Sequence, residues 1–174
     1  MFSSVRDRLF VSIALGILAG DIVTKRIAEA RLPLHQPQEV FGELLRWTLT
    51  YNTGAAMNMH VGPSSRVIFS VIAVVMIGVI LRMWRGLPPT STWLSASLAM
   101  IVAGAAGNLI DRLRSANGVV DFIDVGIGST RFWTFNVADA GVSVGAVILA
   151  NLTWREPVPE SAPVPKDEDA PPPA

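Results

Sequence analysis

Four apolar runs stand out along the chain, separated by segments in which polar and apolar residues mix. Each run is 15 to 18 residues long, and together they cover Leu9–Val23, Val67–Leu81, Trp93–Ile110 and Ala140–Trp154. A helix that crosses a bilayer needs about 20 apolar residues, with a range that begins near 17. One such run would be ambiguous, but four runs with almost no polar face predict four spanning helices. We therefore expect an all-α membrane protein, folded as a bundle of four transmembrane helices.

The first run has a second interpretation, as a cleaved secretory signal peptide. Arg6 and Arg8 precede it, and the Leu18–Gly20 segment offers small residues of the kind that a signal peptidase cuts after. Against this, the apolar sequence continues through Ile22 after Asp21. The continuation favours a retained helix.

The segments outside the runs differ in kind. Arg46–Tyr51 alternates like a β-strand within the long segment Lys25–Ser65, and Asn52–Gly54 follows as a turn signal. Arg112–Arg131 is predicted to be a loop. The residues from 155 onward hold seven of the twelve prolines, which is typical of a disordered, solvated tail. We expect one membrane domain over residues 1–154 and a disordered tail over residues 155–174.

Composition supports a membrane protein and narrows its chemistry. Hydrophobic residues make up 51% of the 174 residues and charged residues only 16%, whereas about a quarter of a soluble domain is charged. The net charge is zero, so the basic surface of a nucleic-acid binder is missing and no nucleic-acid partner is expected. With no cysteine and only His35 and His60, thiolate nucleophiles are excluded and a histidine-rich metal site is not expected.

Polar residues associated with the runs gather at one end of the predicted bundle. Four alternating helices bring the ends of the first and third, and the starts of the second and fourth, to the same side of the membrane. The residues that fall there are Asp21, Lys25, Asn52, Gly54, Asn108, Asp111, Arg112, Asp121, Asn136 and Asp139. An aspartate at mid-membrane costs about 2.5–3.5 kcal/mol and less near a helix end, so these side chains need partners or water.

Ion pairing is one role that these residues can have. Lys25 follows Asp21 by one helical turn, and Arg112 is adjacent to Asp111, so both pairs can anchor helix ends at the membrane interface. Asp139 has no basic residue close to it in the sequence. The basic residues of the loops leave the orientation in the membrane open, because their counts favour neither side strongly.

Small residues indicate where helices pack closely. Gly104 and Gly107 lie three residues apart in the third run, and Gly141 and Gly145 lie four apart in the fourth. Such spacings place the glycines on one helix face and let two backbones approach.

Paired carboxylates are the most promising chemistry. Two aspartates about 3 Å apart cannot both ionise, so one remains an acid while the other acts as a base on a water between them. Spacing alone does not select a pair from Asp21, Asp111, Asp121, Asp124 and Asp139. A proton relay, a small transporter and a purely structural anchor stay open as alternatives, although clustering at one end disfavours a path across the membrane.

Five short motifs occur in order along the chain. They are Asp21–Lys25 (DIVTK), Asn52–Ala56 (NTGAA), Gly104–Arg112 (GAAGNLIDR), Val120–Phe122 (VDF) and Phe135–Asp139 (FNVAD). Each is weak alone, but the set resembles the bacterial lipoprotein signal peptidase (signal peptidase II) family over roughly Leu9–Trp154. Two positions depart from the usual pattern. Met57 stands where the family usually has Phe, and Ala103 stands where it often has Gly.

The resemblance implies an aspartic endopeptidase that removes the signal peptide of a diacylglyceryl-modified prolipoprotein by cutting before the lipidated cysteine. It implies that Asp121 and Asp139 are the catalytic pair. Our hypothesis for the mechanism is that Asn108 and Asn136 donate hydrogen bonds to the substrate backbone and that Arg112 holds the loop of Asp121. The full set that the resemblance implies to bind substrate or support the site is Asp21, Lys25, Asn52, Gly54, Asn108, Asp111, Arg112, Asn136 and Ala138. Neither a metal nor another cofactor is implied.

The resemblance also implies a location and partners. The enzyme would be a monomer in the bacterial cytoplasmic (inner) membrane, with cytoplasmic termini and a site toward the outer, periplasmic face. Lys25–Ser65 would form a small sheet and an amphipathic segment over that site. Its partners would be prolipoproteins and membrane lipids, with the cyclic peptide globomycin as an inhibitor.

Overall fold

Helices form where the apolar runs predict them, and each extends beyond its run. The computed structural model describes residues 4–54 and 62–154. Its helices are α1 (Val5–Arg31), α2 (Ser65–Gly86), α3 (Thr92–Arg114) and α4 (Val137–Trp154). The largest extension is at α1, which continues eight residues past Val23 because residues 24–30 are mostly good helix formers. The first part of the Lys25–Ser65 segment is therefore helix, and the Leu18–Gly20 segment lies inside α1.

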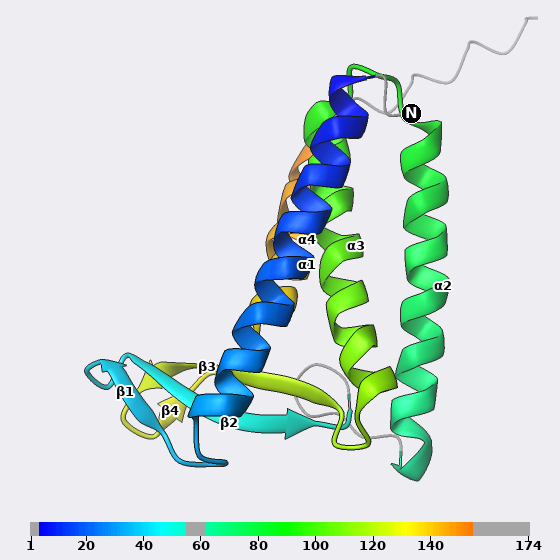
Figure 1. The fold of residues 1–174 in the computed structure, drawn as a ribbon. Helices are drawn as coiled ribbons and strands as arrows, with labels where there is room; N and C mark the ends of the chain where they lie inside the picture. The colour runs from blue at the N-terminus through cyan, green and yellow to red at the C-terminus, as the bar shows by residue number, and fades with distance from the viewer. Residues whose placement is uncertain (1–3, 55–61, 155–174) are drawn as a thin grey trace, which may run out of the picture.

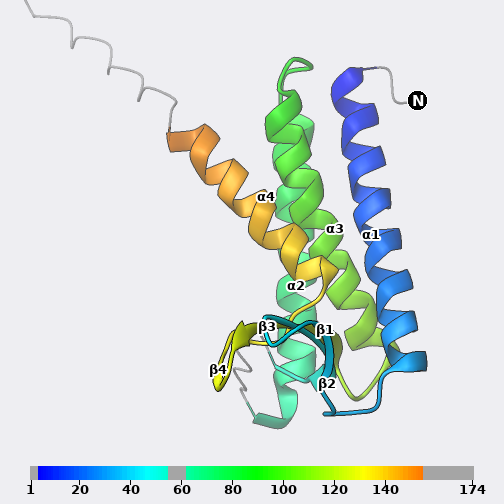
Figure 2. The same cartoon turned by 90° about the vertical axis from the view of Figure 1, so that its left-hand side faces the viewer.

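The third helix lies at the centre of the bundle. α1, α4 and α2 all pack against α3, and α2 makes its main helix contact there (Figure 1). α4 crosses α3 at an angle and diverges from it toward Trp154 (Figure 2). α3 therefore carries the contacts that bring the other three helices to one site.

Three of the described helices, α2, α3 and α4, are long and apolar enough to cross a membrane. The outer surface of α2 fits this, since Val67, Val71, Val74 and Val75 are each 56–59% exposed, and soluble proteins seldom expose so continuous an apolar face. α1 has 27 residues and runs alongside α3 (Figure 1), but charged residues occupy both of its ends, at 6–8 and from Asp21 onward. The protein is membrane-embedded, and a fourth span at α1 stays a prediction.

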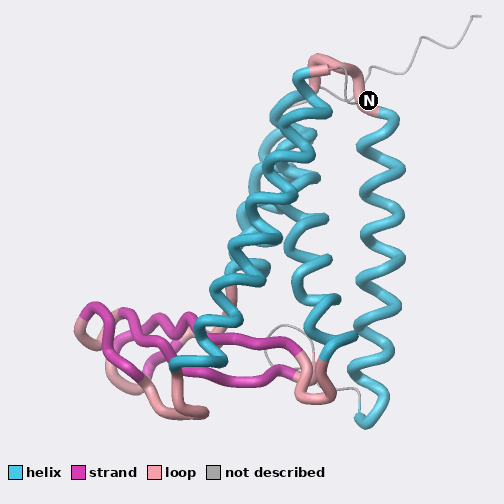
Figure 3. The backbone as a smooth tube through the Cα atoms, in the orientation of Figure 1, coloured by secondary structure: helices cyan, strands magenta, loops and turns pink. Residues whose placement is uncertain are grey.

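A four-stranded sheet closes one end of the bundle. Its strands are β1 (Gln38–Phe41), β2 (Leu45–Asn52), β3 (Val119–Ile127) and β4 (Thr130–Arg131), all antiparallel in the order β1-β2-β3-β4. Figure 3 shows the sheet across the end of the helices that is remote from the start of α1. The strand predicted at Arg46–Tyr51 is confirmed as part of β2.

The prediction of an all-α fold with strands only between the first two helices is wrong in one respect. β3 and β4 lie between α3 and α4, in the Arg112–Arg131 segment predicted to be a loop. β3 is rich in β-branched residues, and four consecutive positions, Val119–Phe122, are all buried. A strand buried on both faces does not alternate between apolar and polar residues, so β3 has no two-residue period to reveal it.

Some predictions concern residues outside the described ranges. Ala55, Ala56, Met57 and His60 lie between residues 54 and 62, and the expected tail lies beyond residue 154. The division into a membrane domain and a disordered tail therefore stays a prediction.

Candidate active site

Asp121 and Asp139, here called the aspartate pair, come from two segments that backbone hydrogen bonds hold together. Asp121 lies in β3, where it pairs with Thr50 of β2. The next residue along β3, Phe122, and Ile123 both donate backbone N–H groups to the carbonyl of Phe135, at 3.0 and 2.8 Å. Because α4 begins two residues after Phe135, this contact fixes the first turn of α4 beside β3.

The first turn of α4 places Asp139 through a reciprocal cap. The Asn136 side-chain oxygen accepts the Asp139 N–H at 2.9 Å, and the Asp139 Oδ2 accepts the Asn136 N–H at 3.2 Å. This is the geometry of a capping box, in which the residue before the helix and the third helical residue satisfy each other's free N–H groups. The cap fixes the orientation of the Asp139 carboxylate.

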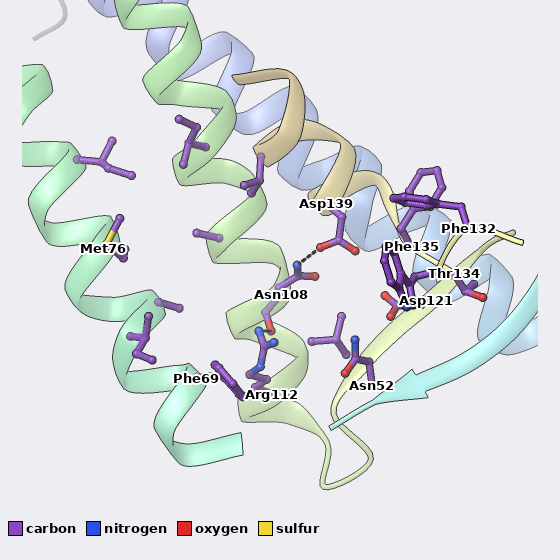
Figure 4. Close-up of a pocket in the computed structure, with 18 residues that line it drawn as sticks. Asn52, Phe69, Met76, Asn108, Arg112, Asp121, Phe132, Thr134, Phe135 and Asp139 are labelled. Carbon is purple, nitrogen blue, oxygen red and sulfur yellow. Dashed lines mark hydrogen bonds between the residues drawn. The ribbon is translucent and has the colours of Figure 1, made fainter. Parts of the chain in front are cut away.

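Two asparagines each hold one member of the aspartate pair. Asn136 donates from Nδ2 to Asp121 Oδ1 at 2.7 Å. Asn108 of α3 donates from Nδ2 to Asp139 Oδ1 at 2.7 Å, and Figure 4 shows this second hydrogen bond. Asn136 is fully buried and also donates to Asn108 Oδ1 at 3.2 Å. The side-chain N–H groups of both asparagines therefore orient carboxylates in this structure, whereas a role in binding substrate stays a prediction.

Asp121 is buried beside another carboxylate. Burial raises the pKa of the Asp121 carboxyl from 3.8 to about 7, and the charge of Asp139 adds to the increase. Hydrogen bonds from Asn136 and Asn52 act in the opposite direction and lower this pKa. An aspartate with a pKa near neutrality exists in both protonation states at physiological pH, as a group that gives and takes protons requires.

A second group of buried charges, here called the lysine cluster, lies beside the aspartate pair. It consists of Asp21, Lys25 and Asp111, which are 0–4% exposed. Lys25 Nζ lies 2.8 Å from Asp21 Oδ2 and 2.9 Å from Asp111 Oδ2, and it donates to Asn108 Oδ1 at 2.9 Å. The predicted Asp21–Lys25 ion pair is confirmed, whereas Asp111 pairs with Lys25 and Arg114 rather than with Arg112.

The lysine cluster joins three elements to the site. Asp21 Oδ1 accepts the buried backbone N–H of Ala138 in the first turn of α4 at 2.9 Å. Asp111 Oδ2 accepts the N–H of Val120, next to Asp121 in β3, at 3.2 Å. The carboxylate that holds the segment of Asp121 is thus Asp111, and not the neighbouring arginine as predicted.

Arg112 instead holds the segment after β2. It donates to the carbonyl of Gly54 at 3.0 Å and to that of Asn108 at 3.3 Å. The Gly54 N–H in turn donates to Asn52 Oδ1 at 2.9 Å. These contacts place Asn52 next to Asp121, with which it forms a hydrogen bond.

Glycines allow the helices that carry the site to approach closely. A Cβ at Gly104 would clash with the carbonyl oxygen of Ala138, and one at Gly107 would clash with the Asp21 carboxylate. The small face predicted on the third helix is therefore confirmed. It permits the contact between α3 and α4 that Asn108 and Asp139 need.

The aspartate pair opens into a pocket of about 400 Å³ between α2, α3, α4 and the sheet. Its polar end contains Asn52, Asn108, Arg112 and the pair itself. The rest of its wall is mostly apolar and consists of Phe69, Ile72, Ala73, Met76 and Ile80 of α2, Ile101 and Ala105 of α3, Val119 of β3, residues 132–135, and Val142 of α4. Figure 4 shows Met76 on the α2 side of this space, away from the polar group, and Phe69 beside Arg112.

Asp124, the remaining candidate carboxylate, joins neither the aspartate pair nor the lysine cluster. Asp124 lies 2.8 Å from Arg131 and accepts the Thr48 hydroxyl at 3.0 Å, so it stabilises the sheet. His35 lies near Asp121 in a smaller pocket, described below. Among residues 4–54 and 62–154, no group of three or more histidine, aspartate or glutamate side chains is arranged to hold a metal ion.

The sequence did not predict the loop between β4 and α4 as part of the site. Phe132, Trp133, Thr134 and Phe135 all line the main pocket, and Trp133 is 50% exposed. The signal available in the sequence was three aromatic residues within four positions, Phe132–Phe135, next to Asp139. Exposed aromatic side chains beside candidate catalytic residues often bind ligands.

The family model and the individual relatives that match this sequence point to the same family. A family model described as signal peptidase (SPase) II matches residues 13–155. A lipoprotein signal peptidase of Mycobacterium avium is 41% identical over 155 residues, which covers 85% of this chain and 80% of the relative. One from Pseudomonas paraeruginosa is 37% identical over 150 residues, covering 84% and 87%.

Solved structures agree with this assignment. Two structures of a bacterial membrane enzyme, determined by the in meso method at 2.3 and 1.9 Å resolution, each match with a TM-score of 0.78 and 26% identity. The matches cover 88% and 90% of this chain, and 92% and 99% of theirs. From the family match and these relatives together, the chain belongs to the signal peptidase II family of membrane proteases.

Proposed function

We propose that the protein is an aspartic endopeptidase that removes the signal peptide from diacylglyceryl-modified prolipoproteins by cutting before the lipidated cysteine. Asp121 and Asp139 are the catalytic residues in this proposal. The relatives are named lipoprotein signal peptidases, which supports the substrate class. The reaction type is argued from the site itself.

The arrangement of the aspartate pair carries the proposal. Both carboxyl groups open into one pocket, and each accepts a hydrogen bond from an asparagine amide. Amides orient a carboxylate without neutralising it. A pair held in this way retains one proton between its members near neutral pH, in agreement with the raised pKa of Asp121.

The first chemical step adds water to the scissile carbonyl. Asp139, as the ionised member, takes a proton from a water molecule while the oxygen of that water bonds to the carbonyl carbon. Asp121, as the protonated member, gives its proton to the carbonyl oxygen, so that a neutral tetrahedral diol forms. Asn52 hydrogen-bonds Asp121 and keeps that carboxyl directed at the reacting atoms.

The second step breaks the carbon–nitrogen bond. Asp139 returns its proton to the departing amine nitrogen, and Asp121 recovers a proton from one hydroxyl of the diol as the carbonyl re-forms. The products are a signal peptide with a free carboxyl group and a lipid-modified cysteine with a free amine. The aspartate pair ends with the one proton with which it began, so it is ready for another turnover.

The apolar part of the pocket suits the lipid of the substrate. Its wall is formed by α2, α3 and α4, and Met76, Ile80 and Ile101 lie at the end of the wall away from the aspartate pair. Acyl chains are apolar and lie in the bilayer, so they reach the site between helices rather than through water. α2 makes its main helix contact with α3, which supports lateral entry beside α2.

The orientation is part of the proposal. The start of α1 and the turn between α2 and α3 lie at the end remote from the sheet (Figure 1). Placing that end in the cytoplasm puts the site and the sheet at the outer face. There the signal peptide of an exported protein, its lipid and its mature polypeptide can all reach Asp121 and Asp139.

The test uses purified protein in detergent with a diacylglyceryl-modified prolipoprotein, beside the same precursor without lipid. Cleavage is followed by mass, which also identifies the bond that is cut. We expect wild type to cut only the lipidated precursor, immediately before the cysteine, and Asp139→Asn to cut neither. Cleavage of the unlipidated precursor at an equal rate would contradict the substrate class, and activity in Asp139→Asn would contradict the aspartate pair.

A further inference from the structure

Asp121 lines a second pocket besides the one that holds Asp139. This pocket has a volume of about 270 Å³, and its lining residues are His35, Thr50, Tyr51, Asn52, Asp121, Trp133 and Thr134. None of these residues belongs to a helix. Four of them, Asn52, Asp121, Trp133 and Thr134, line the main pocket as well. The two pockets therefore meet at Asp121, and we call the smaller one the sheet pocket.

The two pockets differ in chemistry. The main pocket runs between the membrane helices, and its wall is mostly apolar. The sheet pocket is bounded by β2, β3 and two loops, and its lining carries hydroxyl, imidazole, amide and indole groups. Such a pocket offers hydrogen bonds to a peptide, whereas acyl chains find little apolar surface in it.

The position of the sheet pocket relative to Asp121 is fixed by strand pairing. Thr50 pairs with Asp121 across the β2–β3 ladder, and Tyr51 pairs with Val120. The register shifts between Trp47 and Thr50, and in this bulged stretch the Leu49 carbonyl accepts the His35 N–H at 2.9 Å. The bulge thus attaches the loop after α1 to the sheet and forms one wall of the pocket.

His35 is held in an unusual conformation at this wall. Its φ is +58°, the left-handed region that residues other than glycine seldom adopt. Such conformations persist where the surrounding contacts fix them, and they are frequent at ligand sites. Here the hydrogen bond to Leu49 fixes the backbone, and the exposed imidazole lines the pocket.

We infer that the sheet pocket binds the residue that follows the lipid-modified cysteine of the substrate. The inference rests on the proposed function. The signal peptide and the acyl chains both approach from the bilayer, so they reach Asp121 from the side of the helices. The mature polypeptide is the part of the substrate that continues into water, and it requires a polar, non-helical surface that touches the scissile bond. The sheet pocket has these properties, and it shares Asp121 with the main pocket, where the proposed function places the lipid.

This assignment gives the enzyme a preference at a substrate position outside the signal peptide. A volume of about 270 Å³ is small beside the roughly 300–1,000 Å³ of typical ligand pockets, so it holds one side chain with its backbone. The enzyme then selects substrates by the size of the side chain that follows the cysteine. Trp133 and Thr134, which line both pockets, separate the lipid from the peptide that follows it.

The test compares lipidated precursors that differ in one residue. One has Gly and the other Trp immediately after the cysteine, and a second pair carries the same change at the third residue before the cysteine. Wild type, Thr50→Phe, His35→Gly and Thr130→Phe are assayed with each precursor for kcat/KM. Thr130 is exposed in β4 and lines neither pocket, so its substitution is the matched control for an added ring.

Opposite changes are expected from the two pocket variants. Thr50→Phe fills the pocket and lowers the Trp-to-Gly ratio of kcat/KM at the residue after the cysteine by about tenfold or more. His35→Gly enlarges the pocket without backbone strain, because glycine adopts positive φ readily, and it raises the same ratio. Thr130→Phe leaves the ratio at its wild-type value.

Three results would decide against parts of this picture. Ratios unchanged in both pocket variants would overturn the inference, and so would changes confined to the third residue before the cysteine. His35→Gly keeps the test valid should Thr50→Phe fold poorly. Failure of wild type to cut the lipidated Gly precursor would instead contradict the proposed function, so the two failures are distinguishable.

Discussion

Two groups of buried aspartates lie at the same end of the bundle, and they differ in what surrounds them. In the lysine cluster, Asp21 and Asp111 share one ammonium at 2.8 and 2.9 Å. In the aspartate pair, Asp121 and Asp139 each accept a hydrogen bond from a neutral asparagine amide at 2.7 Å. The ammonium of Lys25 compensates the charges of the first group, whereas in the second group burial and the neighbouring charge of Asp139 raise the pKa of Asp121. The first environment builds structure, and the second supplies an acid and a base.

The largest expected effect comes from removing either member of the aspartate pair. Asp121→Asn and Asp139→Asn each remove a group that transfers protons, while the amide keeps nearly the same shape. General acid and base steps contribute about 10²–10⁴-fold each, and the pair acts as a unit. We therefore expect kcat to fall by at least about 10³-fold in each variant, measured on the lipidated precursor, with the fold retained by circular dichroism.

Asp124→Asn is the matched control for these substitutions. Asp124 lies three residues further along β3 than Asp121, but it is paired with Arg131. Losing that pair lowers the melting temperature and leaves kcat of the folded protein within a few-fold of wild type. A loss as deep as that of Asp121→Asn would mean that the ion-paired aspartates take part in the chemistry, and the contrast between the two groups would fail.

The next effect tests the lysine cluster as a structural element. Lys25→Met leaves Asp21 and Asp111 buried with no ammonium between them. Breaking a buried ion pair in this way costs about 3–5 kcal/mol, so the melting temperature in detergent should fall sharply. The Asp121 segment should also loosen, since Asp111 holds the Val120 N–H.

A compensating variant distinguishes lost charge balance from lost packing. Asp21→Asn and Asp111→Asn added to Lys25→Met remove the uncompensated charges, and replacing a whole buried ionic group is often close to neutral. We expect the triple variant to melt above Lys25→Met. If it melts no higher, then the ammonium acts through its contact with Asn108 rather than through charge, and Asn108→Ala should reproduce the defect.

The sequence predicted the helices and the end of the bundle where the candidate site lies. The helices follow from the four apolar runs, and the shared end follows from the alternating direction of successive helices. The sequence did not select the aspartate pair from five candidate carboxylates without the family motifs. That choice depends on which partner each aspartate meets, and Asp111 shows why: its sequence neighbour is Arg112, but its ion-pair partners are Lys25 and Arg114. Contacts between distant segments cannot be read from spacing in one chain.

The missed elements have a physical reason as well. β3 is buried on both faces, so it lacks the alternation by which β2 was recognised. The loop at Trp133 and Thr134 carries no charged residue, and it gains its role only when β3 and α4 are brought together. Pockets form between elements, and their walls are therefore the least predictable part of a site.

A smaller effect concerns stability against pH. The pKa of Asp121 is about 7 in the folded protein against an ordinary value of 3.8. Between these values the folded protein keeps a proton that the unfolded chain releases, so this group contributes stability at low pH that is lost as the pH rises toward 7. We expect about 2–4 kcal/mol from it across that window. The difference in melting temperature between wild type and Asp121→Asn, followed from pH 4 to 8, isolates the contribution, and a difference independent of pH would contradict the raised pKa.

The smallest effect tests the amide side of the comparison. Asn52 hydrogen-bonds Asp121 and lowers its pKa, so Asn52→Ala should raise that pKa further. A hydrogen bond worth about 1 kcal/mol corresponds to roughly 0.7 pH units. Because the proposed mechanism needs the proton on the aspartate pair, kcat/KM falls as the pH rises through the pKa of Asp121, and this alkaline limb should move upward in Asn52→Ala. Thr48→Val, which removes a hydroxyl bonded to Asp124 instead, should leave the limb in place. A limb that moves downward in Asn52→Ala would mean that a different group, and not Asp121, supplies the acid.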